Sequence, residues 1–128
     1  LEKALRLELK AHENLSGLLV KADKAVIRLE EAIARGQANE RDVSALEKAL
    51  KELKEQIRTA RVSHGRVADL LADPAGFDTN GKVIDPRKAN ETIKEIHQSQ
   101  QGIRRSIGET LKDTLKAIRE YCQDNALD

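Results

Sequence analysis

The sequence predicts an all-α fold: an antiparallel three-helix bundle or coiled coil of long helices, with a short β-hairpin-like connection between the second and third helices. Two observations lead to this fold class. Charged residues make up 35% of the 128 residues and aromatic residues only 2%, a composition typical of long amphipathic helices and coiled coils. Apolar residues also recur in alternating steps of three and four, as on one face of a helix. The length suits a single helical domain, 1–128.

The first helix is expected over about residues 1–35. Its apolar stripe follows the three-four spacing, with a second aliphatic row beside it: Leu15, Leu18, Ala22, Ala25, Leu29 and Ala32, flanked by Leu5, Leu19, Val26 and Ile33. Gly36 suits the left-handed position just past a helix end, and Asn39 is a suitable N-cap for the next helix. The predicted connection is therefore short, which makes the second helix an antiparallel neighbour of the first.

The second helix is expected over about residues 39–72 and has the most regular pattern in the chain. Its seam is unbroken over nine positions: Val43, Leu46, Leu50, Leu53, Ile57, Ala60, His64, Val67 and Leu71. Such spacing is typical of a coiled coil. The pair Asp73-Pro74 ends the helix, because the residue before a proline is pushed out of the helical region.

The third helix is expected over about residues 86–124. Asp85 is a good N-cap, and Pro86 suits the first helical position. The apolar stripe begins with Ala89, Ile93, Ile96, Gln100, Ile103 and Ile107. After Ile107 it moves to Leu111, Leu115, Ile118 and Cys122, a step that resembles a stutter and would locally unwind a supercoil.

The connection between the second and third helices contains the stretch FDTNGKVIDP, residues 77–86. Asn80-Gly81 is a favoured pair for a two-residue type I′ turn. The residues around it suit short paired strands: Phe77, Thr79, Val83 and Ile84. We therefore predict a miniature β-hairpin here.

Two functional alternatives exist for this connection. A calcium loop of the EF-hand type would place Gly76 and Arg87 at its first and twelfth positions, where carboxylates are required, so the calcium alternative is weak. Phe77 is the only phenylalanine, and at an exposed loop tip it would be an anchor for a partner protein.

The net charge and the cysteine content limit the classes of function and the cellular location that we expect. The 23 basic and 22 acidic residues give a net charge of +1, so no global field attracts nucleic acid or an anionic membrane. The single Cys122 forms no intramolecular disulfide, and no export segment opens the chain, which favours the cytoplasm, or the host cytoplasm if the protein is viral. No run of about 18 apolar residues occurs, so no membrane span is expected. We expect no cofactor.

The three histidines are the first candidate constellation. Counting along antiparallel helices places His12, His64 and His97 near one level of the bundle, and three imidazoles are enough ligands for zinc. One alternative is a polar layer, shared with Gln100, that fixes helix register or oligomeric state. The other is that the three histidines are partly solvated side chains with no shared role. A helical-bundle sensor or metal-binding protein is the corresponding alternative function.

A row of basic residues on the third helix is the second candidate. Spacings of seven, four and three put them near one face: Arg105, Lys112, Lys116 and Arg119. Such a row can bind the phosphates of double-stranded DNA. The alternative is a solvated face in which nearby carboxylates pair with the cations. Because no nucleophile elbow, oxyanion loop or orienting third residue accompanies Ser63-His64, we expect no enzyme activity.

The last eleven residues, IREYCQDNALD (118–128), resemble the closing segment of some small terminase subunits of tailed bacteriophages. The chain departs from many members of that family because it lacks an N-terminal helix-turn-helix. The resemblance implies a ring-forming protein that recognises viral DNA and passes it to the packaging motor.

These observations favour a non-enzymatic, self-associating helical scaffold or adaptor that acts through its helix faces. Homo-oligomers form when aliphatic seams leave apolar surface uncovered, as a thin bundle with few aromatic residues should. A protein partner is expected for the same reason, and double-stranded DNA is the partner that the terminase resemblance implies.

Overall fold

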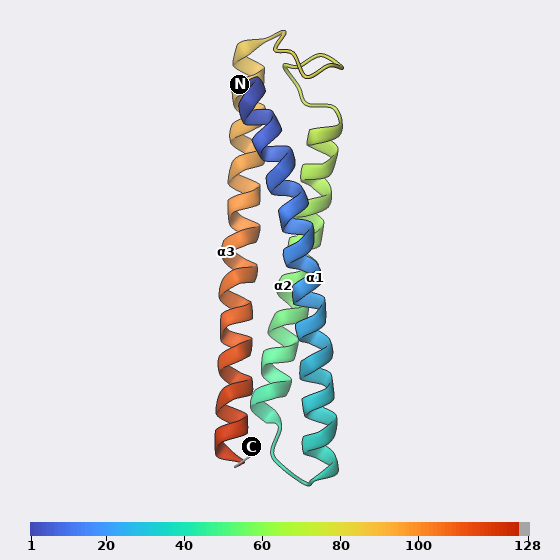
Figure 1. Ribbon diagram of the computed structural model, residues 1–128, viewed down its shortest axis with the longest axis vertical. Coiled ribbons are helices and arrows are strands. Elements are labelled where there is room, and N and C mark those ends of the chain that lie inside the picture. The colour runs from blue at the N-terminus through green and yellow to red at the C-terminus, as the bar shows by residue number, and fades with distance from the viewer. Residues whose placement is uncertain (126–128) are drawn as a thin grey trace.

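The computed structural model describes residues 1–125, which form three helices: α1 (Glu2–Ala38), α2 (Ser44–Ala72) and α3 (Pro86–Asp124). The helices lie side by side in a narrow bundle, with α1 and α3 running in one direction and α2 in the other (Figure 1). The 37 residues of α1 span about 55 Å at a rise of 1.5 Å per residue. The predicted all-α fold of three long helices is confirmed. No helix in the described part of the chain is long and apolar enough to cross a membrane.

The connection between α1 and α2 differs from the prediction. Helix α1 continues through Gly36, and α2 begins five residues later than expected. Asn39 closes α1 instead of opening α2, because its side-chain Nδ2 donates to the carbonyl oxygen of Arg35 at 2.9 Å. Glu40, with φ of 55°, takes the left-handed conformation expected of the glycine. The interpretation of Gly36 as a helix stop and of Asn39 as an N-cap was therefore wrong.

Gly36 is required by packing and not by backbone conformation. A Cβ atom at this position would lie 2.4 Å from Cγ1 of Val43 and 2.5 Å from the hydroxyl oxygen of Tyr121. These two residues come from the beginning of α2 and the end of α3. The missing side chain therefore lets all three helices meet closely at this end of the bundle.

The connection between α2 and α3 is not a β-hairpin. Within residues 73–85 the only pairing of the β type is one isolated antiparallel bridge between Phe77 and Val83, and neither residue belongs to a strand. A type I′ turn needs positive φ at both central residues, but Gly81 has positive φ (78°) and Asn80 does not. The predicted hairpin was therefore wrong.

Asp78 explains why this connection forms a compact turn. Its carboxylate oxygen Oδ1 accepts hydrogen bonds from the backbone N–H groups of Asn80, at 2.8 Å, and Lys82, at 2.9 Å. Its carbonyl oxygen accepts a further bond from the N–H of Gly81 at 3.0 Å. One aspartate thus satisfies three backbone donors within the connection.

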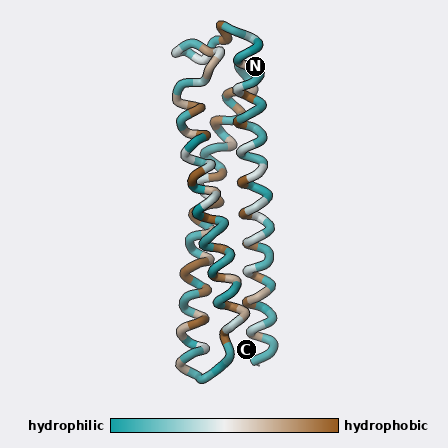
Figure 2. The backbone as a smooth tube through the Cα atoms, turned by 180° about the vertical axis from the view of Figure 1, so that it is seen from behind, coloured by the Kyte–Doolittle hydropathy of each residue, from teal (hydrophilic) through white to brown (hydrophobic). Residues whose placement is uncertain are grey.

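The core follows the predicted seams along most of the bundle. Apolar residues, brown in Figure 2, recur along each helix between longer hydrophilic runs. On α2 most seam positions are buried, and His64 is partly exposed. A fully buried set of large aliphatic side chains joins the helices: Leu15, Leu19, Leu29, Leu46, Leu53, Ile96 and Ile107.

The end of α3 departs from the prediction. The buried row continues from Ile107 in steps of seven to Thr114 and Tyr121, which are 2% and 8% exposed, whereas Leu115 is 56% exposed. Thr114 can be buried because its hydroxyl donates to the carbonyl oxygen of Thr110 at 2.9 Å. The predicted stutter was wrong as a description of the core, since the shifted apolar residues lie beside the seam and not in it.

Candidate functional site

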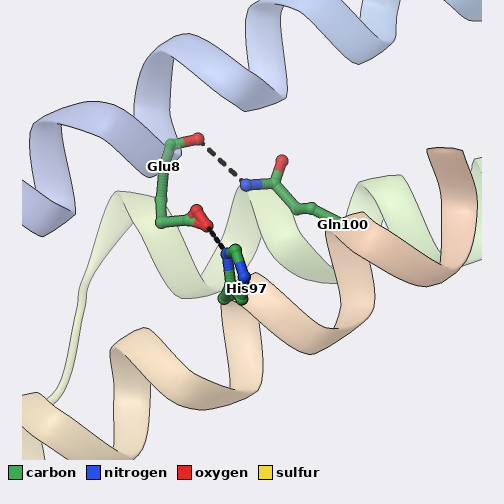
Figure 3. A network of polar contacts seen from close by, with 3 residues as sticks. All are labelled: Glu8, His97 and Gln100. Carbon is green, nitrogen blue, oxygen red and sulfur yellow. Dashed lines mark hydrogen bonds and ion pairs between the residues drawn. The ribbon is translucent and has the colours of Figure 1, made fainter.

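A cluster of polar side chains interrupts the apolar core between α1 and α3. Glu8 is 6% exposed, and its carboxylate Oε1 accepts a hydrogen bond from Nδ1 of His97 at 2.8 Å. The buried Gln100 donates from Nε2 to the carbonyl oxygen of Glu8 at 3.0 Å. Figure 3 shows both α3 side chains directed at this one residue of α1. Because the buried carboxylate has a partner, it can remain in a mostly apolar environment.

Sequence reasoning missed Glu8, although a signal was present. The steps from Leu5 to Glu8, His12 and Leu15 are three, four and three, so a glutamate and a histidine occupy adjacent positions of the apolar stripe of α1. Charged residues at stripe positions indicate a buried polar pair.

His12 and His64 form a second part of the same polar region. Their rings are stacked, with centroids 3.8 Å apart and planes inclined by 7°. Nε2 of His64 lies 3.0 Å from the carbonyl oxygen of His12 and 3.3 Å from Oγ of Ser16. A carbonyl oxygen only accepts hydrogen bonds, so the contact with His12 is a hydrogen bond in the tautomer that has the proton on Nε2 of His64.

His12 is held toward its neutral form. Burial lowers the pKa of His12 below its ordinary value, and the nearby His64 lowers it further, while Gln100 and Glu13 act in the opposite direction. Nδ1 of His12 and Oε1 of Gln100 are both buried without an ordinary hydrogen-bond partner. An imidazole N–H at Nδ1 and an amide oxygen are complementary as hydrogen-bond donor and acceptor.

The structure does not bring the three histidines together around one point. His12 and His64 stack on each other, whereas Nδ1 of His97 is bonded to Glu8. Stacked rings direct their nitrogen lone pairs outward in nearly parallel planes and not toward a shared ion. Within residues 1–125 no group of three or more histidine, cysteine, aspartate or glutamate side chains is placed to hold a metal ion.

Phe77 lies inside the structure and not at an exposed loop tip. Its side chain is 6% exposed and packs with Leu5 and Ala89 in a small core at the end of the bundle. Here it anchors the connection to α1 and α3, so in this conformation it is not accessible to a partner protein.

The predicted basic row is exposed along α3. Its members are Arg105, Lys112, Lys116 and Arg119. Lysine and arginine form three ion pairs with carboxylates within residues 1–125. These pairs join α1 to α2 and α2 to α3 and include none of the four residues: Lys54–Glu30, Arg61–Asp23 and Arg66–Glu95. The expected pairing with neighbouring carboxylates of α3 is therefore not observed in this part of the chain.

A shallow groove between the C-terminal halves of α1 and α3 is a concave feature that sequence reasoning missed. It consists of two adjoining hollows of about 440 and 330 Å³, which share Arg28, Leu115 and Ile118. We call it the α1–α3 groove. Its α3 wall contains the residues that the sequence placed in the core: Leu111, Leu115, Ile118 and Cys122. The displaced stripe on α3 was the signal for this surface.

Comparisons with protein families, with curated proteins and with solved structures found no significant match to this chain. The resemblance to small terminase subunits therefore has no support beyond residues 118–128. Of these, residues 126–128 lie outside the part that the structure describes.

Proposed function

We propose that this protein is a non-enzymatic, self-associating helical scaffold or adaptor that acts through its helix faces. One observation supports the proposal: large aliphatic side chains remain exposed on the helix faces, in addition to those buried between the helices. Three of them share one side of α1, since they are separated by eleven and seven residues, or about three and two turns. This outer stripe comprises Leu9, Val20 and Ile27, which are 42%, 50% and 54% exposed.

The outer stripe favours self-association for a physical reason. Each exposed aliphatic side chain that becomes buried contributes about 1 to 3 kcal/mol. A stripe on a straight helix is self-complementary when a second copy packs against it across a two-fold axis. The stripe therefore forms an isologous contact between two copies of α1.

Light scattering coupled to size-exclusion chromatography tests this proposal. The wild-type protein should elute as a closed assembly, and the double variant Val20→Ser/Ile27→Ser should dissociate to a smaller mass. Ile84→Ser is the matched control, because Ile84 is 68% exposed but lies in the connection between α2 and α3. A monomeric wild type over the whole accessible concentration range would contradict self-association.

A second candidate function is binding of double-stranded DNA, as the terminase resemblance implies. The supporting observation is the exposed basic row of α3, whose four cations lack ion-pair partners in residues 1–125. If all four contact phosphates, log K should fall against log salt with a slope of about −3.6.

A gel-shift titration over several salt concentrations measures this slope. The double variant Lys116→Glu/Arg119→Glu should weaken binding to unrelated DNA sequences equally. Lys51→Glu/Arg58→Glu on α2 serves as the control, because it replaces one lysine and one arginine and changes the net charge by the same amount. Unchanged binding in the double variant would exclude this surface as the DNA contact.

A further inference from the structure

The α1–α3 groove has the shape of a binding site for one more helix. Its α1 wall is built from residues in steps of three and four between positions 21 and 36, and its α3 wall from similar steps between 111 and 122. These stretches are about 16 to 22 Å long, or three to four helical turns. Walls built from such steps present ridges between which the side chains of another helix can pack.

The floor of the groove is apolar and asymmetric. Helix α1 contributes the small side chains of Ala25 and Ala32, whereas α3 contributes Leu111, Leu115 and Ile118. The small residues of α1 allow the backbone of an added helix to approach closely. The leucines of α3 offer the added helix aliphatic contacts. An amphipathic helix with its apolar side inward therefore fits this floor.

The rim of the groove is strongly basic. Five of its residues are cationic and only Glu31 is acidic: the cations are Lys21, Lys24, Arg28, Arg35 and Arg41. None of the five takes part in the ion pairs found within residues 1–125. Arg119 lies one turn beyond Leu115 on the α3 side and adds a further positive charge.

This charge distribution distinguishes between occupants. Two copies of the chain joined groove to groove would bring one cationic rim against another, which costs energy. A helix that carries carboxylates on both sides of its apolar face would instead place each of them near a lysine or arginine of the rim. Charge complementarity thus favours an acidic partner over a second copy.

We infer that the α1–α3 groove is the docking site for an acidic amphipathic helix of a partner protein, which completes a four-helix arrangement. The inference rests on the proposed function, because it specifies which partner one helix face of the adaptor binds. Leu115 supplies the central apolar contact, and Arg28, which lines both hollows, supplies the central charge.

Fluorescence anisotropy with two synthetic helical peptides of about 21 residues tests this inference. Both carry leucine and alanine on one face at helical spacing; one has glutamate and the other lysine at every flanking position. At low salt the glutamate peptide should bind at least about tenfold more tightly than the lysine peptide. Arg28→Glu and Leu115→Ser should each weaken this binding by about fivefold or more.

Matched controls are Lys51→Glu and Val62→Ser on α2, which change the same kinds of side chain away from the groove. Both should leave binding of the glutamate peptide unchanged. Because Arg28 and Leu115 are exposed, their variants should keep the helical circular dichroism signal and melting temperature of the wild type.

Three results would overturn the inference. Equal binding of the two peptides would show that charge does not select the partner. Loss of binding in Arg28→Glu together with full binding in Leu115→Ser would show a diffuse charge contact without docking in the groove. If neither peptide binds but the protein self-associates, the inference fails while the proposed scaffold function stands; a monomer that binds neither peptide would refute both.

Discussion

Substitution of Gly36 by alanine separates two opposing physical effects. Replacing a glycine inside a helix by alanine ordinarily stabilises a protein by about 0.5 to 1 kcal/mol, because alanine restricts the unfolded chain and favours the helix. At Gly36 the added Cβ would lie 2.4 Å from Val43 Cγ1 and 2.5 Å from the Tyr121 hydroxyl oxygen. Carbon atoms in good contact are about 3.5 to 4.0 Å apart, so the neighbours must move by about 1 Å or more.

Overpacking of this kind costs about 1 to 3 kcal/mol. After the helix preference is added, Gly36→Ala should be neutral or up to about 2.5 kcal/mol less stable than the wild type. Gly17→Ala is the matched control, because Gly17 is also in α1 and nothing lies within 4 Å of its added Cβ. The control should be up to about 1 kcal/mol more stable than the wild type.

Urea unfolding followed by circular dichroism measures both free energies of unfolding. The two variants should differ by about 1 to 3 kcal/mol, and the difference should shrink when Tyr121→Phe removes one of the two close contacts of Gly36→Ala. If Gly36→Ala stabilises the protein as much as Gly17→Ala does, close packing at this end of the bundle is not the reason for the glycine.

Two further predictions concern the polar region. The free energy of unfolding should decrease as the pH falls below about 6.5. The reason is that burial and His64 lower the pKa of His12 in the folded state, so the unfolded chain binds the proton more readily. The other titratable or polar groups near His12 are Glu8, Glu13, His97 and Gln100. The urea midpoint of the wild type should therefore be lower at about pH 5.5 than at about pH 7.5, and this difference should be smaller in His12→Gln. An equal difference in both proteins would exclude His12 as the cause. His97→Ala should cost about 1 to 3 kcal/mol, because it leaves the nearly buried carboxylate of Glu8 without its partner. Its melting temperature should recover in part when Glu8→Gln is added, and failure of that recovery would show that the unpaired carboxylate is not what destabilises the single variant.

The sequence alone determined the helices and most of the core. Repeated three-four spacing gave three helices, and the rule that an aspartate before a proline ends or caps a helix placed both the end of α2 and the beginning of α3 correctly. These signals act within a few residues of the chain, so they can be read without knowledge of the packing.

Only the tertiary structure decided which residues make contacts between distant parts of the chain. Gly36 looks like a helix terminator in the sequence, but its role depends on Tyr121, which lies 85 residues further along the chain. In the same way, the apolar pattern of α3 does not say whether Leu115 or Thr114 faces the core. That choice depends on how α3 is rotated against α1 and α2.

The candidate site also has some features that the sequence predicts and others that only the packing of the helices produces. The sequence indicated a polar region from three histidines and a basic row on α3, since both are visible as residue types at regular spacing. Only the packing of the helices could show that His97 pairs with Glu8 and that His12 stacks on His64. The α1–α3 groove likewise exists only because two helix faces from distant parts of the chain lie next to each other. Its basic rim could not be predicted from the net charge of +1, because that charge is a sum over the whole chain.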